Sequence, residues 1–368
     1  MQVFRRFWFL SVLIATVAVV FVWNVFHYNT YWGYDGGAHI DYIFTIADEG
    51  RYPTMEENYL AWHEPLYYLM NGGIVAVLQA VDIPRVAVLK ILQVESALWG
   101  VAFVFFSTLL AWLVTKNKTI TSIIVGLIGF LPELSEASRF VTNEIAFHAL
   151  VLGWLALFWH WRMYDSSEWT YRKWVWMAIG LLLLLYVKLS AVIILIALSL
   201  WLCINALMSR SVKPIVIISL LIATIAIGFS PWLIYKQHTM GNAFTINTYE
   251  GQKDEARSRL PMSFYTSWDN GIVQYPFWQA GTRSFWSMLY ADTLGDYYNI
   301  FQNYEDEPRG GSFLTANGRV MSGERAGRTL LLYWWSAAGV ILLVAGFIAG
   351  AIRVFHEENK KDSLPLEG

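Results

Sequence analysis

The chain has 368 residues, of which 56% are hydrophobic and 15% are charged, against about a quarter charged in an ordinary soluble domain. This composition argues against a soluble enzyme. The formal net charge of −2 provides no positive excess that would attract a nucleic acid. The single cysteine, Cys203, excludes a disulfide framework and a multi-cysteine metal site within one chain.

Apolar runs along the chain predict an all-α integral membrane protein, because a helix of about 20 apolar residues crosses the hydrocarbon core of a bilayer. The first run follows Arg5 and Arg6 without a small-residue cleavage site after it, which is typical of an uncleaved anchor. Eight runs are candidates for crossing: residues 7–27, 91–115, 119–134, 143–161, 173–187, 189–207, 214–235 and 329–355.

A ninth apolar stretch, residues 66–81, decides the topology. It contains Gly72-Gly73, and at about 16 residues it is short for a crossing. If it lies along the outer surface, the positive clusters of the chain all fall on the cytoplasmic side, as the positive-inside rule requires. These clusters are Arg5/Arg6, Lys116/Lys118, Arg162/Arg172/Lys173, Arg210/Lys213 and Lys360/Lys361. We therefore predict eight crossings with both termini in the cytoplasm.

This topology divides the chain into three parts. Residues 1–235 form a transmembrane module, whose first outer loop, residues 28–90, carries the chemistry. Residues 236–328 form an extracytoplasmic loop or cap, and residues 329–368 supply the last transmembrane helix and a cytoplasmic tail. The segments that then share the extracytoplasmic face are residues 28–90, residues 132–142, the turn at Lys188 and residues 236–328.

The first outer loop contains the strongest candidate base. If a helix begins at Gly36, Asp35 and His39 stand one turn apart on the same face, where a base and an orienting or metal-binding group can cooperate. Two alternatives stay open. Asp35 also suits a helix N-cap, and His39 also suits a hydrogen-bonded packing residue.

A second polar pair in the same loop, His63-Glu64, precedes Pro65. Proline favours the first turn of a helix, and the start of a helix is a natural anion site. The pair therefore indicates a ligand or metal site. The alternative is that both side chains are ordinary polar groups at headgroup level.

Four further polar residues lie at the ends of predicted spans. Arg139, Asn143 and Glu144 come just before or at the start of the span 143–161, and Lys188 interrupts two apolar runs. Ionisable groups at such positions usually have a function. The alternatives are helix capping for Asn143 and Glu144 and a snorkelling side chain for Lys188.

Aromatic residues make up 17% of the chain, more than interfacial belts usually need. In residues 231–242 and 285–298 they alternate with polar and acidic groups. Sugars offer apolar ring faces and many hydroxyls, so this pattern favours a carbohydrate ligand. A loop that rests on lipid headgroups would have the same composition.

Four stretches together resemble the GT-C superfamily of polytopic glycosyltransferases, particularly the branch that includes protein O-mannosyltransferases and lipid A aminoarabinose transferases. Residues 34–42 (YDGGAHIDY) resemble the family's acidic motif, and residues 63–68 (HEPLYY) resemble its His-Pro-Pro-Leu-Tyr-Tyr stretch. Asn143-Glu144 and the stretch from Pro231-Trp232 to Gly241-Asn242 resemble two later signatures. The sequence departs from the family pattern at Gly36, where many relatives have Glu, and at Glu64, which replaces a proline.

The resemblance implies an inverting transfer of a sugar from a polyprenyl-phosphate donor to a hydroxyl of a glycan, lipid or protein acceptor, with Asp35 as general base. Lys188 or Arg139 would stabilise the departing phosphate, and Asn143 and Glu144 would position the donor. The alternative to these fixed cations is a divalent cation, Mg²⁺, Mn²⁺ or Ca²⁺. Its candidate ligands are Asp35, His39, His63 and Glu64.

Such an enzyme would modify the cell envelope from the extracytoplasmic face, and the compactness of the chain favours a bacterial or archaeal cytoplasmic membrane. Two rival functions stay open. A polysaccharide ligase or polymerase would use a glycan linked to lipid pyrophosphate. A transporter or flippase would be expected to carry inverted repeats and broken helices, and no repeat is evident in the sequence.

Overall fold

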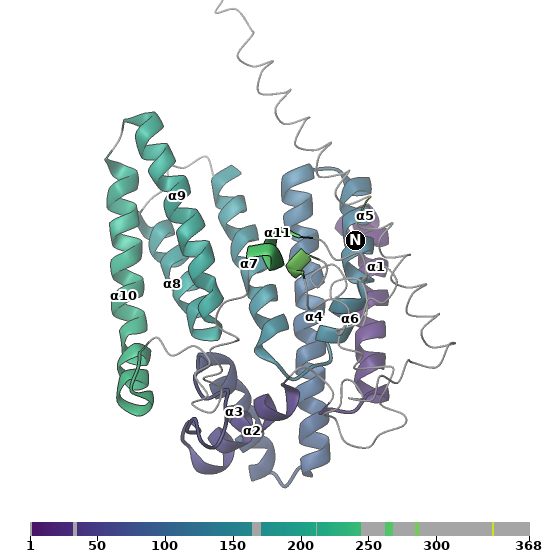
Figure 1. The fold of residues 1–368 in the computed structure, drawn as a ribbon. Coiled ribbons are helices and arrows are strands. Elements are labelled where there is room, and N and C mark those ends of the chain that lie inside the picture. Colours follow the sequence, from purple (N-terminus) through teal and green to yellow (C-terminus); the bar gives the residue numbers. More distant parts are fainter. Residues whose placement is uncertain are drawn as a thin grey trace, which may run out of the picture. The chain divides into compact units, whose positions relative to one another are not determined.

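The computed structural model describes residues 2–31, 35–163, 171–210, 212–243, 262–267, 284–286 and 341. The chain consists of two compact units, residues 1–125 with 134–259 and residues 126–133 with 260–368. In the described ranges all regular elements are helices and none is a strand (Figure 1). They are α1 (Gln2–His27), α2 (Gly36–Glu49), α3 (Leu66–Ala80), α4 (Arg85–Thr115), α5 (Lys118–Gly129), α6 (Pro132–Ala137), α7 (Asn143–Met163), α8 (Tyr171–Val187), η1 (Leu189–Ala191), α9 (Val192–Ser209), α10 (Lys213–Met240) and α11 (Met262–Thr266).

Five helices in the described ranges are long and apolar enough to cross a membrane. They are Trp8–His27, Arg85–Thr115, Asn143–Trp161, Leu189–Met208 and Lys213–Met240, and they match five of the eight predicted runs. The runs 119–134 and 173–187 contain α5 and α8, of 12 and 17 residues. The run 329–355 lies outside the described residues except for position 341. An all-α membrane fold agrees with these helices, whereas the count of eight crossings stays a prediction.

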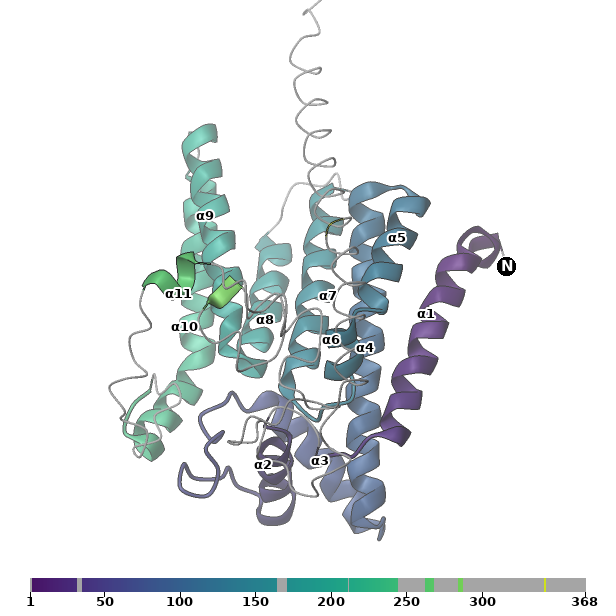
Figure 2. The ribbon, with the colours of Figure 1, turned by 45° about the vertical axis from the view of Figure 1, so that its right-hand side comes forward.

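Residues 66–81, predicted to lie along the surface, form α3, which has 15 residues and is shorter than a typical crossing helix. α3 packs beside α2 at one end of the bundle (Figures 1 and 2). Their contact is close at Gly72, where an added Cβ would lie 2.6 Å from Cγ2 of Ile46 and 3.3 Å from the carbonyl oxygen of Ile43. Glycine therefore lets the two short helices touch.

This close contact gives a prediction about stability. Gly72→Ala is expected to destabilise the protein by about 1–3 kcal/mol, because the added methyl overpacks the contact. Gly73→Ala is the matched control, since nothing lies within 4 Å of its added Cβ and alanine favours a helix more than glycine does. Thermal unfolding of both variants in detergent checks this. An unfolding midpoint for Gly72→Ala at or above that of Gly73→Ala would contradict the close packing.

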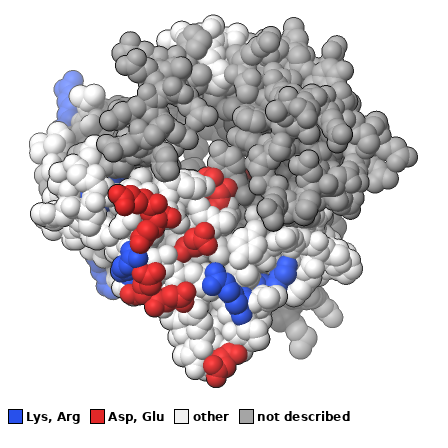
Figure 3. Space-filling view, turned by 60° about the horizontal axis from the view of Figure 1, so that its bottom comes forward, with Lys and Arg blue, Asp and Glu red and all other residues white. Residues whose placement is uncertain are grey.

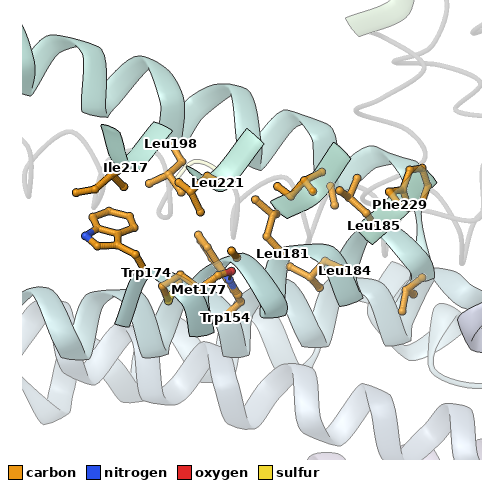
Figure 4. Packing of buried hydrophobic residues seen from close by; sticks show 14 of the residues in the cluster. Trp154, Trp174, Met177, Leu181, Leu184, Leu185, Leu198, Ile217, Leu221 and Phe229 are labelled. Atoms are coloured by element: carbon orange, nitrogen blue, oxygen red, sulfur yellow. Dashed lines mark hydrogen bonds between the residues drawn. The ribbon is translucent and has the colours of Figure 1, made fainter. Parts of the chain in front are cut away.

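α7 to α10 pack around an apolar core that includes Met177, Leu181 and Leu185 of α8. Figure 4 shows Leu181 and Leu185 facing Leu221 and Phe229 of α10. A second core joins α2 and α3 to the beginning of α4. The first turns of α4 therefore support α2 and α3, while its later turns belong to the bundle.

α10 contains an internal proline, Pro231, which removes one backbone donor and disturbs the preceding turn. Two hydroxyls compensate for this. Ser230 donates to the carbonyl of Ile227 at 2.8 Å, and Tyr186 donates to the carbonyl of Gly228 at 2.7 Å. Neighbouring side chains thus satisfy the altered turn, as is usual for proline in apolar helices.

The end of α1 is fastened to α4 by Lys90. Its Nζ donates to the carbonyls of Val25 and Tyr28, both at 2.7 Å, and to Oε1 of Gln93 at 2.8 Å. Cations near a helix C-terminus satisfy its last carbonyls in this way. The loop that leaves α1 therefore starts from a fixed position.

Three of the segments predicted to share one face do meet at one end of the bundle. Glu64 accepts a hydrogen bond from the backbone of Leu189. Asn143 reaches the carbonyl of Val187, and Gln93 reaches the carbonyl of Arg139. Their common location is confirmed, while the side of the membrane on which they lie stays a prediction.

Candidate functional site

Asp35 immediately precedes α2 in a left-handed backbone conformation, with φ 56° and ψ 13°. Its side chain makes no capping hydrogen bond, so the N-cap role considered for this carboxylate does not describe it. Instead, Oδ1 accepts a hydrogen bond of 2.6 Å from the hydroxyl of Tyr59. A left-handed non-glycine residue stores strain of about 1–3 kcal/mol, and such residues concentrate at functional sites.

His39, His63 and Tyr68 form a buried polar chain. The Tyr68 hydroxyl lies 2.8 Å from Nδ1 of His39 and 3.3 Å from Nδ1 of His63. Tyr42 stacks on Tyr68, with ring centroids 3.8 Å apart. Burial, with the positive charge of Lys188 as a further cause, lowers the pKa of His63 to about 4. Burial also lowers the pKa of His39. Both imidazoles are therefore neutral at pH 7.

Asn143, at the start of α7, joins this chain to the break between α8 and η1. Its Nδ2 lies 3.4 Å from Nδ1 of His63 and 3.2 Å from the carbonyl oxygen of Val187. Its Oδ1 is buried and has no hydrogen-bond partner among the described residues. The side chain thus connects two loops and leaves one acceptor unused.

Glu64, the residue after His63, is also buried, with 2% of its surface exposed. Its Oε2 accepts a hydrogen bond of 3.0 Å from the backbone N–H of Leu189, and its Oε1 is buried without a partner. Burial raises the pKa of this carboxyl, and the positive charge of Lys236 partly opposes the rise. Lys236 of α10 is itself 2% exposed, so a buried lysine and a buried carboxyl lie within electrostatic reach of each other.

Lys188 forms an ion pair with Glu144 of α7. Its backbone is extended, with φ −160° and ψ 131°, between the end of α8 and the start of η1. At this break the ammonium group reaches Glu144 in the first turn of α7. The side chains remain 22% and 45% exposed, respectively, so an incoming anion can compete with Glu144.

Arg139, the other predicted phosphate ligand, is directed towards α1. Its guanidinium lies 3.7 Å from the ring centroid of Tyr28, a cation–π distance, and its carbonyl accepts a hydrogen bond from Gln93. These two contacts connect Arg139 to the residue that follows α1 and to α4. They give no support for a role beside Lys188.

The predicted metal ligands do not form a metal site in the described ranges. No three His, Cys, Asp or Glu side chains gather there as a metal ion would require. The carboxylate of Asp35 is held by Tyr59, while Nδ1 of His39 and Nδ1 of His63 both face Tyr68. In the described ranges, Asp35, His39, His63 and Glu64 do not gather around one point as the ligands of one cation would.

Three aromatic rings adjoin the site from α10 and the first loop. Tyr52 lies 5.5 Å from Trp232 and 5.1 Å from Tyr235, and these two rings are stacked 5.1 Å apart. They include part of the aromatic stretch 231–242 that predicted a carbohydrate ligand. The other predicted stretch, 285–298, falls almost entirely outside the described residues.

The first loop carries an acidic surface. Exposed carboxylates from α2 and the following loop gather on one face (Figure 3). Arg51 makes ion pairs with Glu49 at 2.6 Å and Glu57 at 2.7 Å. Hydrogen bonds from Arg51 lower the pKa of Glu57 to about 2. This carboxylate therefore stays charged over the whole physiological range.

Tyr59, Tyr68 and Lys236 were not predicted as site residues from the sequence. Tyr59 contacts Asp35 and Tyr68 contacts His39. These pairs are more than 20 residues apart in the sequence, so no local pattern predicts them. Lys236 had a signal, because it is a lysine that follows directly on an apolar run, and a buried charge at a span end usually has a function.

The buried histidines make stability depend on pH. The pKa of His63 is about 4 in the folded protein against 6.5 for an ordinary histidine. The unfolded chain therefore binds a proton between these values that the folded chain does not. The contribution of His63 to the free energy of unfolding is fully present above pH 6.5. It decreases by about 3 kcal/mol as the pH falls from 6.5 towards 4.

Unfolding midpoints at pH 7.5 and 5 measure this effect. We expect His63→Gln to show a smaller fall than the wild type, with His238→Gln, which changes an exposed histidine, as the control. An equal fall in the wild type and His63→Gln would show that His63 does not carry the pH dependence.

The helices and the site together indicate the class of an all-α membrane protein with a buried polar site at one end of its bundle. Comparison of the chain with protein-family models, with curated proteins and with solved structures gave no match.

Proposed function

We propose that the protein is a membrane glycosyltransferase of the GT-C type, which moves a sugar from a polyprenyl-phosphate donor to an acceptor hydroxyl with inversion. One observation carries the proposal. The stretches that resemble this superfamily contact one another, although they are far apart in the sequence. The Tyr68 hydroxyl of the second stretch reaches His39 of the first, and His63 reaches Asn143 of the third. The charge of Lys236, in the fourth stretch, acts at Glu64 of the second.

The residues of the site have distinct roles in this reaction. Asp35, oriented by Tyr59, takes the proton of the acceptor hydroxyl as its oxygen attacks the anomeric carbon. The bond from this carbon to the phosphate oxygen breaks, and the electron pair leaves with the lipid phosphate. Lys188 leaves its ion pair with Glu144 and pairs with the phosphate instead. Lys236 adds a second positive charge that stabilises the departing group. No metal ion is needed for this charge balance.

The surroundings of the site suit the two substrates. The rings of Tyr52, Trp232 and Tyr235 offer apolar faces to a sugar, and residues 236–328 would shape the acceptor side. The apolar helices provide a bilayer environment for the isoprenoid tail. In the proposed orientation the site faces the extracytoplasmic side of a cytoplasmic membrane and both termini are cytoplasmic.

The choice of donor tests the proposal. Purified protein in nanodiscs is given the same labelled sugar on polyprenyl monophosphate or on polyprenyl pyrophosphate, together with membrane-extracted acceptors. We expect transfer from the monophosphate, with an inverted anomeric linkage in the product. Transfer from the pyrophosphate alone would replace the proposal with a ligase or polymerase.

A further inference from the structure

The position of the proton on His63 follows from its neighbour Asn143. Val187 is the last residue of α8, so its carbonyl lacks an intrahelical partner. Nδ2 of Asn143 donates to this carbonyl at 3.2 Å, which fixes the orientation of the amide because its oxygen cannot replace a donor there. The second hydrogen of Nδ2 is then available to Nδ1 of His63 at 3.4 Å. Nδ1 acts as the acceptor, and the proton of the neutral ring is on Nε2.

Other contacts agree with this tautomer. The Tyr68 hydroxyl lies 2.8 Å from Nδ1 of His39 and 3.3 Å from Nδ1 of His63, and this contact agrees with the tautomer when the hydroxyl accepts from Nδ1–H of His39 and donates to Nδ1 of His63. The ring is held by Trp62, with centroids 4.2 Å apart. The positive charges of Lys188 and Lys236 oppose a second proton on the ring. His63 therefore presents an N–H group at Nε2, and it has no lone pair there for a metal ion or for proton abstraction.

We propose that Nε2–H of His63 donates a hydrogen bond to a phosphate oxygen of the lipid-phosphate donor, and that Asn143 is the positioning residue that holds His63 in this form. The inference rests on the proposed function and deepens it. A phosphate oxygen is favoured over a sugar hydroxyl because the charges of Lys188 and Lys236 act at the His63 ring, so this N–H lies in a positive environment. Beside it, the buried indole N–H of Trp62 has no hydrogen-bond partner among the described residues.

The tautomer is measurable without any enzymatic activity. Nitrogen NMR of ¹⁵N-histidine-labelled protein in nanodiscs separates protonated from unprotonated ring nitrogens, and His63→Gln assigns the signal. We expect a protonated Nε2 and an unprotonated Nδ1 in the wild type at pH 7. In Asn143→Asp a carboxylate faces Nδ1, so that nitrogen is expected to become protonated. A wild-type His63 with a proton on Nδ1 would overturn the inference.

Binding of farnesyl phosphate, a short lipid phosphate, tests the ligand. We expect His63→Leu to weaken binding about 10- to 100-fold, as for loss of a hydrogen bond to a charged group. His63→Gln, which keeps an N–H donor, should bind within a few-fold of the wild type, and farnesol should bind all three proteins alike. Wild-type affinity in the well-folded His63→Leu protein, or no binding by the wild type, would overturn the inference.

The two experiments separate this inference from the proposed function. If the tautomer and the farnesyl phosphate results hold while no donor supports sugar transfer, the phosphate contact stands and the transfer reaction fails. If transfer occurs but His63→Leu binds farnesyl phosphate normally, the reaction stands and the role of His63 fails.

Discussion

Asp35→Asn is expected to lower the rate of sugar transfer by about 10²–10⁴-fold, the range that a positioned general base contributes. Asparagine has nearly the shape of aspartate and its amide oxygen can still accept the hydrogen bond from Tyr59, so the loop should keep its structure. The lost property is the ability to take a proton. The defect should therefore appear in kcat, with KM for the donor changed little.

Asp41→Asn is the matched control for this variant. Asp41 lies on the same helix and is exposed, and it has no role in the proposed site. Initial rates with equal amounts of folded protein give the comparison. If Asp35→Asn retained the wild-type rate while Asp41→Asn lost it, the base would be assigned to the wrong carboxylate.

Lys188→Gln is expected to reduce kcat/KM by about 10²–10³-fold, because a fixed cation beside the departing phosphate stabilises its growing charge. The substitution also leaves Glu144 without its cation, which adds a negative charge where the phosphate must bind. The loss should be larger with a poor leaving group, since more charge then develops on the phosphate.

Lys118→Gln removes an exposed lysine at the beginning of α5 and should leave transfer unchanged. Donor titrations of both variants separate binding from turnover. Normal kcat/KM in Lys188→Gln would mean that the ion pair with Glu144 is only structural and that other groups receive the phosphate.

The sequence predicted the helical class and several site residues for clear physical reasons. A long apolar run in a bilayer forms a helix, because a helix satisfies all backbone hydrogen bonds within the segment. The helices α1, α4, α7, α9 and α10 could therefore be predicted from composition. A charge that interrupts such runs is costly to bury, which is why Lys188 was identifiable. The structure places it at a break between helices, beside Glu144.

Other parts of the site depend on tertiary contacts that no local pattern contains. Asp35 was open to a capping role, and only its contact with Tyr59 decides against that role. Arg139 had the charge expected of a phosphate ligand, but its guanidinium packs on Tyr28. His39 and His63 have the residue type of metal ligands, yet Nδ1 of each ring lies at hydrogen-bond distance from the Tyr68 hydroxyl.

The most direct test of the central claim is transfer of a labelled sugar by the purified wild-type protein in proteoliposomes. Polyprenyl monophosphate carries the labelled sugar, and both the label in the acceptor and the released polyprenyl phosphate are measured. A glycosyltransferase should produce them in equal amounts, and the reaction should persist in the presence of a chelator. Labelled lipid that crosses the bilayer with its sugar still attached, and no label in any acceptor, would instead identify a transporter and contradict the account.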